Sequence, residues 1–141
     1  MRIFCFYKTN GQITQVGQCA DFDFDLQKPA AGQHKLELYS GLVSPNDFYI
    51  ENNILVAIPS SPNELMSFDY ESKSWVDNES KAIKLTDIKR KVLLQESDWT
   101  QMPDVEISTK TQWATYRQSL RDITDQPGYP YSIVWPTAPT A

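Results

Sequence analysis

The sequence predicts an α+β protein: an antiparallel β-rich part, residues 1–78, followed by a two-helix hairpin and an extended C-terminal tail, residues 79–141. Three observations predict this. Up to residue 78, short β-branched and aromatic runs alternate with turn-forming residues. After it, apolar residues recur at helical spacing, and no glycine occurs until Gly128. The length of 141 residues allows one domain, or one domain with a modest appendage, with a core that needs no disulfide.

The β-rich part contains signals for six to eight short strands. Asn10-Gly11 favours a two-residue type I′ turn between strands at 2–7 and 13–18, because both central positions of that turn need positive φ. Residues 35–41 alternate again, and Asn52-Asn53 marks the turn of a hairpin within 47–59. Residues 65–77 then predict two short strands around a turn at 71–73.

The segment 19–26 alternates strictly between apolar and acidic residues, which predicts a further strand. One face would carry Phe22, Phe24 and Leu26, and the other would carry Asp21, Asp23 and Asp25. Such a carboxylate row can bind a hard cation such as calcium, but the glycine and final glutamate of an EF-hand loop are missing. A solvated face that guards a sheet edge is therefore the preferred interpretation.

The helical part begins near Ser80, and its first helix is expected to end around Ser97 with Leu85, Ile88 and Val92 on its apolar face. Asp98 or Thr100 is expected to organise the loop through Pro103 that follows, and Ser108 is the expected N-cap of the second helix. The apolar face of that helix comprises Trp113, Tyr116, Leu120 and Ile123. The segment Gln126–Pro130 is expected to end it.

The net charge of −5 is unevenly distributed, because residues 1–80 carry 5 basic and 11 acidic side chains. An acidic chain argues against binding to nucleic acid, which requires clustered positive charge. No apolar run is long enough for a signal peptide or a membrane span, so no membrane association is expected. Two cysteines without a CxxC motif, Cys5 and Cys19, indicate reduced thiols in the cytosol. We therefore expect a soluble protein made in the cytoplasm.

The sequence offers no positive reason to propose an enzyme, a cofactor or a metal centre. His34, the single histidine, lies in an expected polar loop without a second imidazole or a nucleophile motif nearby. GxSxG, HExxH and P-loop motifs are also absent from the sequence.

The C-terminal part is rich in aromatic residues, which serve as anchors of cores or interfaces. They are Trp99, Trp113, Tyr116, Tyr129, Tyr131 and Trp135. One interpretation is a small core that joins the helices to the tail; the other is that some of them, Trp135 above all, contact a partner. Arg117 and Arg121 are placed to meet a carboxylate such as Asp98, Asp104 or Asp122, either to hold the loop or to bind a partner. We expect Trp99 to fold back and close the open end of the helix pair.

These residues also carry a resemblance, which extends over about fifty residues from "LLQESDWTQMPD" to "IVWPTAP". The pattern is similar to the C-terminal signature of the phage tail assembly chaperone family, found among tail fibre assembly proteins. The matching positions are Leu93, Leu94, Asp98, Trp99, Thr100, Pro103, Asp104, Trp113, Ala114, Tyr116, Arg117, Leu120, Arg121, Asp122, Ile123, Trp135, Pro136 and Pro139. Met102 stands where a leucine is more usual.

The resemblance implies a non-enzymatic protein that helps a phage tail fibre or other tail protein to fold, trimerise or attach, with the fibre's C-terminal region as the expected contact. It implies action in the host cytoplasm, after which the protein is released or retained on the virion. A permanent adaptor of the tail is the main alternative. A small enzyme that uses Asp21, Asp23 and Asp25 with a divalent cation is a third hypothesis.

Overall fold

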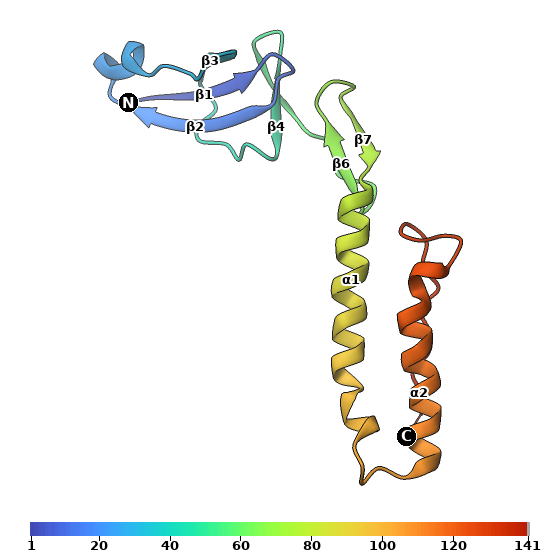
Figure 1. Ribbon diagram of the computed structural model, residues 1–141. Coiled ribbons are helices and arrows are strands. Elements are labelled where there is room, and N and C mark those ends of the chain that lie inside the picture. The colour runs from blue at the N-terminus through green and yellow to red at the C-terminus, as the bar shows by residue number, and fades with distance from the viewer. Residues whose placement is uncertain (141) are drawn as a thin grey trace. The chain divides into compact units, whose positions relative to one another are not determined.

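The computed structural model describes residues 1–140 and separates into two compact units. Residues 1–62 and 67–76 form the first, which we call the β unit, and residues 63–66 and 77–140 form the second, the helical unit. Antiparallel strands precede helices along the chain, so the predicted α+β class is confirmed (Figure 1). Within residues 1–140, no helix combines the length and apolar character that crossing a bilayer requires.

The β unit is built on a three-stranded antiparallel sheet with the order β2-β1-β3. Its strands are β1 (Arg2–Lys8), β2 (Ile13–Cys19) and β3 (Gln33–Leu38). Successive side chains of a strand point to opposite faces, and both faces of β1 are covered. Phe4 and Phe6 pack on Phe24 at one face, and Cys5 packs with Ile13, Leu38 and Ile50 at the other. Complete burial raises the pKa of the Cys5 thiol to about 11.

The first hairpin is present, but its predicted turn type is wrong. Gly11 has a φ of 88° while Asn10 is not among the positive-φ residues, so the turn is not type I′. Lys8 N–H donates to Gln12 O, and Gly11 N–H donates to Lys8 O, which closes a three-residue loop. The register shift between Phe6 and Tyr7 accommodates the extra residue. A Cβ at Gly11 would lie 2.2 Å from Ile50 O. Both this close approach and the positive φ therefore disfavour any side chain at this position.

The two other predicted hairpins are confirmed. Strands β4 (Phe48–Glu51) and β5 (Ile54–Ala57) are joined by Asn52 and Asn53, with φ angles of 51° and 61°. Asparagine tolerates this left-handed conformation better than other side chains do. Strands β6 (Met66–Asp69) and β7 (Ser74–Asp77) flank the expected turn, where Lys73 has a φ of 55°.

The strand predicted at residues 19–26 is wrong, because the segment forms a 3₁₀ helix, η1 (Asp21–Leu26). Both edges of β1 are already paired, and the three-residue repeat of η1 turns only Phe24 inward. Phe24 packs edge-on against Phe4 and lies beneath the Arg2 guanidinium, 3.7 Å from the ring centroid. Phe22 and Leu26, expected on a buried face, are 83% and 71% exposed.

His34 also differs from its prediction, because it lies in β3 rather than in a loop. Its side chain is exposed, as expected, and its ring lies 5.3 Å from that of Tyr7, between centroids.

The helical unit contains two long helices, α1 (Glu79–Glu96) and α2 (Ile107–Arg121), with the 3₁₀ turns η2 (Asp98–Gln101) and η3 (Asp122–Asp125). The range predicted for the first helix is confirmed, and Asn78 caps it by accepting a hydrogen bond from Lys81 N–H. The predicted apolar face is wrong for Ile88 and Val92, and only Leu85 of its three residues is partly buried. Ala82 and Thr86 are buried, whereas Ile88 and Val92 are 50% and 44% exposed.

The ends of α2 differ from prediction as well. Its N-cap is Glu106, so Ser108 lies inside the first turn instead of capping it. At the other end, α2 stops at Arg121 and η3 continues the chain, well before Pro127. The inward face is nearly as predicted, with Tyr116, Leu120 and Ile123 buried and Trp113 partly buried.

Candidate functional site

The helical unit is held together by an aromatic and aliphatic cluster. Tyr116, Leu120 and Ile123 form its buried centre, and Leu120 and Ile123 are completely inaccessible. Partly buried residues from α1, α2 and the tail surround them: Leu93, Leu94, Trp113, Tyr129, Ile133 and Trp135. Three chain segments thus share one small core. Burial, with a smaller contribution from the Glu96 carboxylate, raises the pKa of the Tyr116 phenol.

Arg117 joins α2 to the end of α1. Its Nη1 donates to Leu94 O at 2.6 Å and to Ser97 Oγ at 2.8 Å, and its Nη2 donates to Asp98 Oδ1 at 2.7 Å. The last carbonyls of a helix have no partner within the helix and carry partial negative charge, so a guanidinium is well suited to this position. The arginine therefore fixes where the first helix ends.

The turn that follows α1 is closed by buried hydroxyl groups. Ser97 Oγ donates to Leu93 O at 2.8 Å, and Thr100 Oγ1 donates to Ser97 O at 2.6 Å. Both residues are almost fully buried, and every buried side-chain nitrogen and oxygen within residues 1–140 has a partner. Sequence reasoning named Asp98 or Thr100 as the organiser of this loop, and both take part in it, but it did not single out Ser97. The available signal was the pair of hydroxyl residues three apart, directly after a helical run.

Trp99 lies on the outside of this turn rather than in its interior. Its ring centroid is 5.9 Å from that of Trp113, which in turn meets Tyr116 edge-on at 5.5 Å. Because Trp99 remains 50% exposed, the interior of the turn is filled by Ser97 and Thr100. Trp99 thus packs at a tilt against Trp113 on one side and is open to solvent on the other.

The tail folds back along α1 and carries Trp135 onto it. Gln126 clamps the tail, since its side chain donates to Val134 O at 2.8 Å and accepts from Val134 N–H at 2.9 Å. Trp135 packs on the shared cluster, and Lys89 Nζ lies 4.3 Å from its ring centroid. These contacts favour the interpretation in which the tail aromatics join the tail to the helices.

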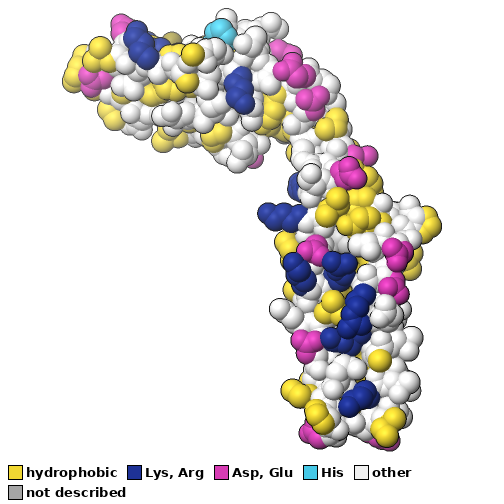
Figure 2. All heavy atoms as spheres, in the orientation of Figure 1, with side chains coloured by type: hydrophobic (Ala, Val, Ile, Leu, Met, Phe, Trp, Pro, Cys, Tyr) yellow, Lys and Arg dark blue, Asp and Glu magenta, His cyan; other side chains and the backbone are white. Residues whose placement is uncertain are grey.

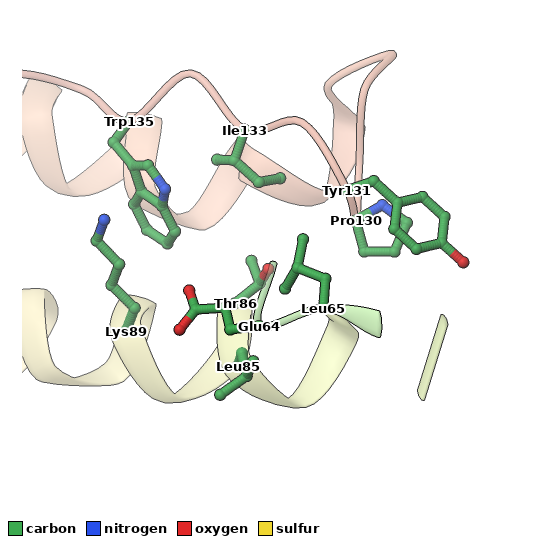
Figure 3. Close-up of a pocket in the computed structure, with 9 residues that line it drawn as sticks. All are labelled: Glu64, Leu65, Leu85, Thr86, Lys89, Pro130, Tyr131, Ile133 and Trp135. Carbon is green, nitrogen blue, oxygen red and sulfur yellow. The ribbon is translucent and has the colours of Figure 1, made fainter. Parts of the chain in front are cut away.

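A cavity of about 230 Å³ opens between the tail, α1 and the segment before it (Figure 3). Its lining mixes apolar side chains with one acidic and one basic group, and comprises Glu64, Leu65, Leu85, Thr86, Lys89, Pro130, Tyr131, Ile133 and Trp135. Figure 3 shows the Lys89 ammonium beside the Trp135 indole at one end of this space. A cavity of this size and lining suits one protruding side chain of a partner rather than a cofactor.

Arg121 does not meet a carboxylate as predicted. Its hydrogen bond is a long one, 3.4 Å from Nη1 to Gln118 Oε1, and its side chain is exposed. Asp122, one of the expected acceptors, instead receives a hydrogen bond from Gln118 at 2.9 Å. Of the two arginines on α2, only Arg117 performs the predicted bridging.

Of the three carboxylates in η1, Asp21 forms an ion pair. Asp21 Oδ1 lies 2.8 Å from the N-terminal ammonium. Among residues 1–140, no three His, Cys, Asp or Glu side chains are grouped so that they could hold a metal ion. The structure therefore adds no support to the hypothesis of a cation-dependent enzyme.

Comparison with known proteins finds a family match within the helical unit. Residues 84–140 match the model of the family described as phage tail assembly chaperone protein. No curated protein and no solved structure matches the chain. The matched region runs from α1 through the Arg117 junction to the tail, so the resemblance noted in the sequence is confirmed there. The sheet β2-β1-β3 lies outside the matched residues.

Proposed function

We propose that this protein is a non-enzymatic chaperone of phage tail assembly that binds a tail fibre or another tail protein and assists its folding, trimerisation or attachment. The observation that carries the proposal is the family match over residues 84–140. In this region the two helices and the tail share one hydrophobic core. Such a unit can present a surface in a fixed geometry at little entropic expense on binding.

The β unit supplies a second feature that suits this function. Strand β3 pairs with β1 on one side, and within residues 1–140 no strand pairs with its other side. Trimeric, β-rich fibres expose unpaired strand edges before their chains come into register. A free strand edge on the chaperone can cover such an edge by strand addition. In this mechanism, the acidic β-rich part provides solubility and selectivity.

Co-expression tests the proposal. The C-terminal fragment of the tail fibre from the same phage is produced with this protein, or with an unrelated acidic protein of equal size, and soluble trimer is measured. We expect several-fold more soluble trimer with this protein, because covered edges cannot aggregate. Equal yields in both samples would contradict the proposal.

The same system separates the chaperone from the adaptor. A released chaperone leaves the fibre before the particle is complete, whereas a permanent adaptor stays in fixed proportion to the tail. Quantitative mass spectrometry of purified particles measures this ratio. A stoichiometric signal without any gain in soluble fibre would favour the adaptor.

A further inference from the structure

The side of α1 that faces away from α2 combines basic and apolar residues. A helix repeats every 3.6 residues, so positions opposite the buried Ala82, Thr86 and Ser97 form one outer stripe. We call this stripe the outer face of α1; its members are Lys81, Lys84, Ile88, Lys91 and Val92. All five side chains are exposed.

The charge of this region is opposite to that of the chain. Between residues 81 and 91 there are five basic side chains and one carboxylate, in a protein whose net charge is −5. The carboxylate, Asp87, is already occupied, since Arg90 lies 2.5 Å and Lys91 2.9 Å from its oxygens. Figure 2 shows Lys and Arg side chains gathered over the part of the molecule where Figure 1 places α1.

Lys81 Nζ donates to Met66 O at 2.9 Å and Lys91 pairs with Asp87, but both side chains are exposed, so these contacts stabilise the free protein only slightly. Lys81 lies in the first turn of α1, where the helix dipole disfavours positive charge, and Lys84 follows it at the repulsive i+3 spacing. Ile88 and Val92 are β-branched, which slightly lowers helix propensity, and about half of each side chain remains in water. A docking function accounts for both the charged and the apolar residues.

We propose that the outer face of α1 is a docking surface for an acidic, amphipathic segment of the tail protein. The inference rests on the proposed function and names the chemistry of the contact. Apolar side chains of the segment cover Ile88 and Val92, and its carboxylates meet Lys81, Lys84 and Lys91. Charge complementarity favours this occupant over the same face of a second copy, because two such faces would repel each other.

The test compares two double variants in binding to the C-terminal fibre fragment, measured by calorimetry at about 50 mM and about 300 mM salt. The first variant, Lys84→Glu with Lys91→Glu, replaces two positive charges on the outer face of α1 with negative ones. Lys110→Glu with Lys28→Glu makes the same change in net charge outside α1 and serves as the control. Both should keep the wild-type helical signal, because these side chains are at least partly exposed and the Lys91–Asp87 pair is a surface contact.

We expect the outer-face variant to bind about 10-fold or more weakly at low salt and to lose most of the salt dependence, while the control variant binds like the wild type. Equal affinities and equal salt dependence of all three proteins would overturn the docking surface but leave the proposed function standing. Absence of wild-type binding would overturn both. Self-association of the wild type, abolished only by the outer-face variant in light scattering, would overturn the tail protein as occupant.

Discussion

Replacing Leu120 with alanine is expected to destabilise the helical unit by about 3 kcal/mol. Leu120 is completely buried between Tyr116 and Ile123, so the change removes transfer free energy and leaves a cavity in a core with few other members. Urea unfolding followed by circular dichroism at 222 nm measures the effect, because both long helices belong to this unit.

Ile107→Ala is the matched control for this prediction. Ile107 is on the same helix but 81% exposed, so its truncation should change the unfolding free energy by no more than about 0.5 kcal/mol. If Leu120→Ala were as mild as this control, the cluster would not be the element that holds the helices and the tail together.

Replacing Arg117 with methionine is expected to destabilise the same unit by about 2 kcal/mol. Methionine keeps the aliphatic bulk but removes the donors to Leu94 O, Ser97 Oγ and Asp98 Oδ1. The Arg117 side chain is 12% exposed, so water reaches the abandoned Leu94 O and Ser97 Oγ poorly, whereas the Asp98 side chain is 65% exposed and is solvated in the variant. The same urea unfolding measurement gives the effect. The total tryptophan fluorescence should also change, since Trp99 follows directly on Asp98 and packs against Trp113.

Arg121→Met provides the comparison on the next turn of the helix. Arg121 is exposed, and its hydrogen bond to Gln118 is 3.4 Å long, so we expect a change of less than about 0.5 kcal/mol. Equal effects at the two positions would show that the bridge from Arg117 to the end of α1 contributes nothing specific.

The sequence was most informative where one local rule decides the structure. Asn52-Asn53 fixes its turn because both residues tolerate positive φ, and the extent of α1 follows from an uninterrupted helical run. The same rule failed at Asn10-Gly11, where an added residue in the register of β1 and β2 changed the turn. Register depends on the partner strand and cannot be read from one segment.

The predictions for residues 19–26 and for the apolar face of α1 were wrong because both depend on the neighbouring elements, which the local pattern does not reveal. The alternating residues of η1 would suit a strand, but β2 and β3 occupy both edges of the sheet's central strand. In α1, both possible stripes contain apolar residues, and the sequence pattern favoured the longer aliphatic side chains. The structure buries Ala82 and Thr86 instead, because small residues allow close approach of the neighbouring segments.

The candidate site was predictable in its members but not in its geometry. Arg117, Asp98, Trp99 and Trp113 were singled out from their types and spacing, and they do meet at the helix junction. Thr100 was named only as an alternative to Asp98, and the buried hydroxyl of Ser97 was missed, since its role depends on a turn whose path is set by tertiary contacts. Arg121 was assigned a carboxylate that only the three-dimensional arrangement could exclude.

The measurement that tests the account most directly is hydrogen exchange of the free protein, followed by mass spectrometry on peptides covering residues 93–123. The account holds that the helical unit is assembled before any tail protein binds. It predicts that amides around Leu94 and Leu120 are already strongly protected in the free protein and exchange only through global unfolding of this unit, and that adding the fibre fragment increases this existing protection by the factor that binding to the folded unit supplies. Rapid exchange of both helices in the free protein, with protection appearing only when the fragment is added, would contradict it.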